Sequence, residues 1–215
     1  NGGTVQDAPI NDPAGILLGK FDGEKTYNGQ ANLPQGSASL AGAEFTVRYY
    51  DGFYDTEQQA EASGEPTRTW VFATDVNGYI DLRYDTPVSG DPLYFTASGT
   101  PIVPRGTLVI RETKAPEGYE LNTDFVSVQK IKGPGDSSNE STYNTPTAPE
   151  QVKRGGLAVT KVDAQTGATP QGDADFKGIE FSIVNDGGND VKVGGKDYKP
   201  GQVVAKITTD GSGRA

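Results

Sequence analysis

Residues 69–83 read TWVFATDVNGYIDLR, and this stretch decides the fold class. Its two ends are rich in β-branched and aromatic residues, which favour strands, and Asn77-Gly78 lies between them. An Asn-Gly pair in this position is the strongest short-range signal for a β-hairpin, because both residues accept a positive φ. The stretch therefore predicts two antiparallel strands that are joined by a tight turn.

Similar strand-like runs surround this stretch. They lie at residues 16–22, 43–50, 93–97, 107–112 and 125–131. In the run 43–50 the apolar residues alternate, which places Phe45, Val47 and Tyr49 on one face. The best helix candidate is short, at residues 56–63, and the 29 Gly and 14 Pro provide many turns. The pattern predicts an all-β fold, either an antiparallel Ig-like β-sandwich or a barrel.

The composition excludes several kinds of chemistry. The 215 residues contain no Cys and no His, so Cys and His nucleophiles, disulfides and thiolate or imidazole metal sites are all excluded. The oxygen-rich segment 75–81 lacks the bidentate Glu of a calcium loop, and we expect no metal and no cofactor. The formal net charge of −10 argues against binding to nucleic acid, and no apolar run is long enough to cross a membrane.

The second part of the chain repeats the first. Lys161 with Asp163 matches Lys20 with Asp22, and the segments Gly178-Ile-Glu-Phe181 and Gly42-Ala-Glu-Phe45 correspond. A repeat of this length indicates tandem domains. We expect an N-terminal tether or edge segment at 1–15, a complete domain at 16–146, a linker at 147–155 and the N-terminal half of a second domain at 156–215. The last range stops before the segment that would complete the second copy.

Two ionisable residues lie on apolar strand faces. Lys20 shares a face with Ile16 and Leu18, and Glu112 shares one with Leu108 and Ile110. A buried charge is costly unless it is paired or neutralised, so we expect the two side chains to meet. Such a contact is compatible with a simple buried salt bridge and also with a reactive pair.

Two segments resemble a known family. They are Leu40-Ala-Gly-Ala-Glu-Phe45 and Val109-Ile-Arg-Glu-Thr-Lys-Ala-Pro-Glu-Gly-Tyr119. Both are similar to signature segments of SpaA-type, or Cna-B-type, prealbumin-like domains, which are β-sandwich modules of Gram-positive pilins and surface adhesins. The resemblance covers Ile16 to Pro146, and Gly156 to Ala215 as a truncated second module.

The resemblance implies an autocatalytic isopeptide bond inside the first domain. Carried onto this chain, Lys20 is the nucleophile, Glu112 is the catalytic acid and Asn144 supplies the acceptor carboxamide. Lys161 is the matching lysine of the second module. The chain is then not an enzyme in the usual sense, because it reacts once with itself.

The resemblance also implies a function and a location. We expect a stalk or spacer module of a cell-wall-anchored adhesin or pilin, outside a Gram-positive bacterium, with the anchor beyond this sequence. Its partners are then neighbouring modules of the same polypeptide. The alternative is a binding module for a host glycan or matrix protein, which would use the aromatic segment Tyr49 to Tyr54. A hydrolase would need two acids across a cleft, and only Glu112 lies on an apolar face.

Overall fold

The computed structural model describes residues 15–19, 34–81, 85–99, 101–131 and 147–215. Contacts within the chain divide it into two units. Unit 1 comprises Asn1–Leu33 and Ala38–Val152, and unit 2 comprises Pro34–Ser37 and Lys153–Ala215. The expected tether at 1–15 lies outside the described residues except for Gly15, where the first strand begins.

Unit 1 is built from two main sheets. The larger has the strand order β10 (Val126–Ile131), β8 (Gly106–Lys114), β2 (Glu44–Tyr50), β3 (Arg68–Ala73) and β5 (Ser89–Gly90), with every pair antiparallel. The smaller has the order β11 (Thr147–Pro149), β1 (Gly15–Gly19) and β4 (Tyr79–Asp81). Two further pairs are β12 (Gln151–Val152) with β9 (Tyr119–Glu120), and β6 (Tyr94–Phe95) with β7 (Pro101–Ile102).

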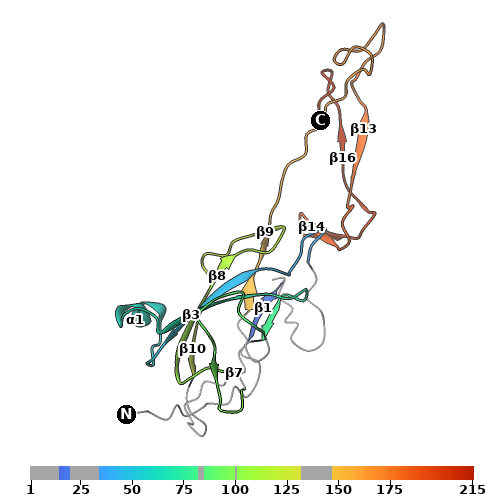
Figure 1. Ribbon diagram of the computed structural model, residues 1–215. Helices are drawn as coiled ribbons and strands as arrows, with labels where there is room; N and C mark the ends of the chain where they lie inside the picture. Colours follow the sequence, from blue (N-terminus) through green and yellow to red (C-terminus); the bar gives the residue numbers. More distant parts are fainter. Residues whose placement is uncertain (1–14, 20–33, 82–84, 100, 132–146) are drawn as a thin grey trace. The chain divides into compact units, whose positions relative to one another are not determined.

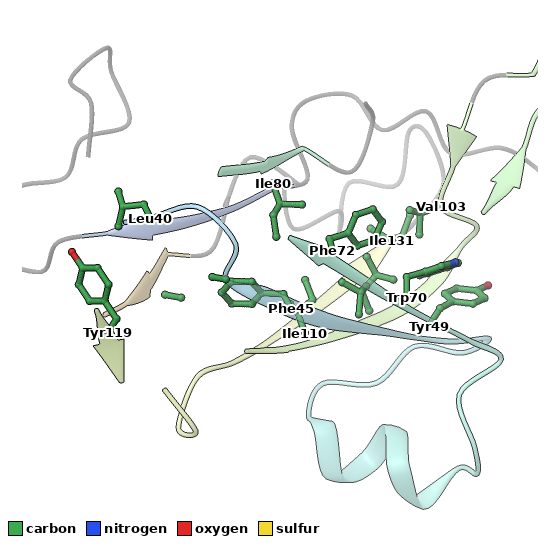
Figure 2. Packing of buried hydrophobic residues seen from close by; sticks show 14 residues of the cluster. Leu40, Phe45, Tyr49, Trp70, Phe72, Ile80, Val103, Ile110, Tyr119 and Ile131 are labelled. Carbon is green, nitrogen blue, oxygen red and sulfur yellow. The ribbon is translucent and has the colours of Figure 1, made fainter. Parts of the chain in front are cut away.

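The core of unit 1 lies between these two sheets. The predicted alternation in β2 is confirmed, because Phe45, Val47 and Tyr49 are all buried. Ile80 of β4 belongs to the same apolar cluster and points toward Phe72 of β3 (Figure 2). Residues from both layers thus exclude water together, which is the packing of a β-sandwich.

Helix α1 (Glu57–Ala62, Figure 1) covers the other face of the larger sheet, where it contacts β8. The helix begins where the sequence predicts, because the Thr56 hydroxyl accepts a hydrogen bond from the Gln59 N–H at 3.2 Å. Ala60 is fully buried against Tyr50 and Val109. The segment is therefore a packed part of the sandwich.

The predicted hairpin at 69–83 is wrong, although its turn exists. Gly78 has a φ of 74°, and the Asp75 carboxylate accepts hydrogen bonds from the N–H groups of Asn77 and Tyr79 at 2.8 and 2.9 Å. However, β3 lies in the larger sheet and β4 in the smaller one. Both edges of β3 are already occupied, by β2 and β5, so the chain after the turn has to cross to the other layer.

Unit 2 contains two small antiparallel sheets. Strands β13 (Glu180–Val184) and β16 (Val203–Thr208) form one, and β14 (Val191–Val193) and β15 (Lys196–Tyr198) form the other. Asn185 is buried where they meet, and its amide donates to the carbonyl groups of Asn189 and Tyr198 at 2.9 and 3.0 Å. Thr160 forms an isolated antiparallel bridge with Arg214.

The two units share a local hydrogen-bond arrangement. In unit 1 the Thr74 hydroxyl accepts from the Ala43 N–H at 3.0 Å and donates to the carbonyl three residues before Ala43. In unit 2 the Thr209 hydroxyl accepts from the Ile179 N–H at 3.0 Å and also donates to the carbonyl three residues earlier. This match agrees with the sequence repeat at these positions, while the truncated second copy at 156–215 stays a prediction.

The stretch expected to be a linker, residues 147–155, contains two strands. β11 pairs with β1 in parallel, and β12 pairs with β9. The contacts assign this part of the chain, as far as Val152, to unit 1. The prolines suggested a linker, but β11 is an edge strand, where a missing N–H is tolerated.

Candidate functional site

Glu112 lies on the inward face of β8. Residues two apart on a strand share a face, and Leu108, Ile110 and Glu112 are 0%, 1% and 5% exposed. In the neighbouring strand Phe45 is the residue paired with Glu112. The expected inward orientation of this carboxyl group is therefore confirmed, and it stands at the edge of the apolar core.

Asn122 holds one side of the Glu112 carboxyl group. Its backbone N–H donates to Glu112 Oε2 at 2.7 Å, and its side-chain amide donates to the Pro149 carbonyl oxygen at 2.8 Å. Asn122 Oδ1 in turn accepts from the N–H groups of Asp124 and Phe125, which fixes the loop before β10. One residue thus connects Glu112 of β8 to the end of β11.

A second acid, Glu150, accompanies Glu112. Both carboxylate oxygens of Glu150 are buried, as is Glu112 Oε1, and none of the three has a hydrogen-bond partner among the described residues. Buried polar atoms are almost always paired, so three unpaired carboxyl oxygens in one place are unusual. They mark this corner of unit 1 as a site where a proton or a donor group belongs.

Burial raises the pKa of both acids, and the negative charge of Glu112 raises that of Glu150 further. For Glu112 burial raises the pKa, and the hydrogen bond from the Asn122 N–H opposes this only in part. For Glu150 burial and then the negative charge of Glu112 raise the pKa to about 8. Near neutral pH the pair consequently retains a proton, because ionising both groups would leave two adjacent buried charges.

The carboxyl pair lies at the C-terminal end of β11, the strand that pairs with the first strand of unit 1. β1 and β11 are parallel, with Leu17 opposite Thr147 and Gly19 opposite Pro149. In the sequence Lys20 follows Gly19, and Glu150 follows Pro149. The predicted nucleophile Lys20 and the predicted acceptor Asn144 themselves lie outside the described residues.

Lys161, the expected lysine of the second module, is among the described residues. It is exposed in unit 2, and its backbone N–H donates to the Gly213 carbonyl oxygen at 2.8 Å.

The aromatic segment of the binding alternative is mostly folded inward. Tyr49 and Tyr50 are 3% exposed, and Tyr54 packs edge-on against Tyr50 with 6.3 Å between the ring centroids. Within this segment Phe53 is the ring on the surface, at 56% exposed. A sugar-binding platform needs several exposed rings, so this arrangement favours packing over binding.

Sequence reasoning missed Glu150 and Asn122. Glu150 follows a proline-containing stretch that has no strand periodicity, and Asn122 lies in a loop. No spacing pattern connects either residue to Glu112. Asn122 reaches it from the loop between β9 and β10, and the pairing of β12 with β9 brings Glu150 to the same place.

Comparison with known proteins agrees with this architecture. The family model described as the SpaA prealbumin-like fold domain matches residues 34–140. This part of the chain is a SpaA-type prealbumin-like domain. The match contains both segments that carried the resemblance, residues 40–45 and 109–119, and it confirms the expected sandwich class.

The other comparisons give less. A search of curated proteins finds no match. Among solved structures the chain is similar to one titled "The Bacillus anthracis TIE protein", with 20% identity and a TM-score of 0.42. The alignment covers 94% of this chain and 25% of that chain, so the SpaA-type chain spans about a quarter of that protein. Within the described residues, no helix is long and apolar enough to cross a membrane.

Proposed function

We propose that this SpaA-type chain is a stalk or spacer module of a cell-wall-anchored adhesin or pilin of a Gram-positive bacterium. An intramolecular amide bond between Lys20 and Asn144 ties its first and last segments together. Lys161 has the same role in a second module. The family match supports a structural module of a surface protein, and buried Glu112 with its unpaired Oε1 is the observation that carries the crosslink.

The surroundings of Glu112 suit the reaction. A carboxyl group whose pKa is raised by burial is protonated more often, and it can then polarise the Asn144 carbonyl group. Lys20 Nζ attacks the carboxamide carbon, Glu112 passes a proton from the amine to the departing nitrogen, and ammonia leaves. One C–N bond forms as another breaks, and no other reactant is needed. Folding supplies most of the acceleration, since it holds the reacting groups in contact.

The crosslink has a mechanical purpose. A bond from Lys20 to Asn144 encloses nearly all of unit 1, and closing a loop of that size stabilises a domain by about 5 kcal/mol in the chain-entropy account. Tension on the chain would pass through the amide, and the sandwich inside the loop would remain folded. A protein without disulfides gains covalent reinforcement in this way.

Intact-mass spectrometry of the folded full chain tests the proposal. We expect a mass that is lower than the calculated one by one ammonia, and peptide mapping should join Lys20 to Asn144. The Lys20→Arg and Glu112→Gln variants should have the full mass, whereas Lys114→Arg, on the exposed end of β8, should still lose ammonia. A wild-type chain at full mass, or a Lys20→Arg chain that still loses ammonia, would refute the crosslink.

A further inference from the structure

Glu112 and Glu150 form a pair that the proposed reaction does not by itself require. Glu112 is 5% exposed, and both oxygens of Glu150 are buried beside it. The Asn122 N–H occupies Glu112 Oε2, which leaves Glu112 Oε1 without a donor among the described residues. Two adjacent buried carboxyl groups cannot both ionise without a large cost, so their protonation states are coupled.

We propose that Glu112 and Glu150 share one proton at neutral pH, and that Glu150 is a positioning residue that keeps this proton beside Glu112. The role of the pair in crosslinking rests on the proposed function. During the reaction Glu112 gives and recovers a proton, and Glu150 acts through Glu112 without contacting the reacting groups. The number of protons on the pair is the same before and after the bond forms.

Other described charges do not neutralise the pair. Besides Glu112, the charged side chains on β8 and on the segment from β9 to the start of β10 are Arg111, Lys114, Glu120 and Asp124. Arg111 binds Glu57, on the other face of β8, and Lys114 binds Glu44 at the exposed end of that strand. Glu120 and Asp124 are exposed. Among the described residues, then, the pair has only itself and the Asn122 N–H to limit its charge.

Asn122 gives the pair a defined geometry. Its N–H fixes Glu112 Oε2, and its side chain binds the Pro149 carbonyl oxygen, next to Glu150 in the chain. Oε2 is therefore the acceptor of a backbone donor, and Oε1 is the oxygen available for the shared proton. Burial raises the pKa of both carboxyl groups, which favours a proton on the pair.

The first test measures crosslinking as a function of pH. Full-length chain purified in denaturant is refolded by dilution at pH 5 to 10, and ammonia loss is followed by intact mass. We expect Glu150→Ala to slow crosslinking by about tenfold or more. Glu150→Gln keeps the size and hydrogen-bonding capacity of the protonated acid and should restore much of the rate at the acidic end of this range. In Glu150→Gln the decline of the crosslinking rate at alkaline pH should move to lower pH, because a single acid without a negative neighbour loses its proton earlier.

Glu120→Gln is the exposed control and should match wild type. A Glu150→Ala chain that crosslinks as fast as this control overturns the positioning role.

The second test does not depend on crosslinking. Infrared difference spectra of the folded Lys20→Arg chain at pH 7 should contain the carbonyl band of one protonated carboxyl group. This band should disappear when Glu150→Gln is added to the Lys20→Arg chain, and it should persist when Glu120→Gln is added instead. If the band is present and wild type never loses ammonia, the proposed function fails and the shared proton stands. If the band is absent, the shared proton is refuted, whatever the crosslinking result.

Discussion

Glu57 should be the most important charged residue for holding α1 on the larger sheet. It lies in the first turn of the helix, is 6% exposed, and binds Arg48 of β2 and Arg111 of β8. The Arg111 Nε–Glu57 Oε1 distance is 2.6 Å. Hydrogen bonds from Arg111, followed by the charges of both arginines, outweigh burial and lower the pKa of Glu57.

The cost of Glu57→Gln can be worked out from these exposures. Removing one partner of a fully buried ion pair costs about 3–5 kcal/mol. Here Arg48 and Arg111 are 21% and 37% exposed, so water takes over part of their solvation after the change. We therefore expect a loss of about 1–3 kcal/mol in the free energy of unfolding at pH 7.

The pH dependence of this loss has a definite sign. The folded pKa of Glu57 lies below its unfolded value of 4.5, so its contribution is complete above that pH. The contribution disappears as the pH falls through the folded pKa, because protonation removes the charge that the arginines bind. The difference between wild type and Glu57→Gln should accordingly shrink in acid.

Urea unfolding monitored by Trp70 fluorescence measures the effect. Trp70 is the chain's one Trp and is buried in unit 1, so its emission reports this unit alone. A Lys20→Arg background prevents the proposed crosslink from interfering. Glu61→Gln is the matched control, since Glu61 is 50% exposed and should cost at most about 0.5 kcal/mol. Equal costs for Glu57→Gln and Glu61→Gln, or a cost that is as large at pH 3 as at pH 7, would refute the reasoning.

Three further changes should be measurable in the same unfolding assay. Phe72→Ala should cost about 3–5 kcal/mol, because this ring is 2% exposed, whereas Phe53→Ala on the surface should cost almost nothing. Thr74→Val keeps the shape but leaves a buried N–H and a carbonyl group unpaired, and should cost about 1–3 kcal/mol. Glu150 binds more protons when folded, so stability should fall as the pH rises from about 5 to 8, by up to about 1.4 kcal/mol per pH unit, and Glu150→Gln should remove this slope. A stability that is flat over this pH range would contradict the raised pKa.

The sequence by itself determined the longer strands and the helix. The alternation of Phe45, Val47 and Tyr49 predicted the buried face of β2, and Thr56 predicted the start of α1. The inward orientation of Glu112 followed from the same period of two. Such features depend on a few neighbouring residues, so local steric and solvation preferences are enough to specify them.

Only the tertiary structure decided which strands pair and which acids meet. The Asn77-Gly78 turn was predicted correctly, but its flanking strands separate into two sheets because β3 has no free edge. Glu150 reaches Glu112 because β12 pairs with β9 and Asn122 binds both Glu112 and the Pro149 carbonyl oxygen. Pairing between distant segments depends on competition for strand edges and on burial of the whole sheet face. No local stretch of sequence determines either of these.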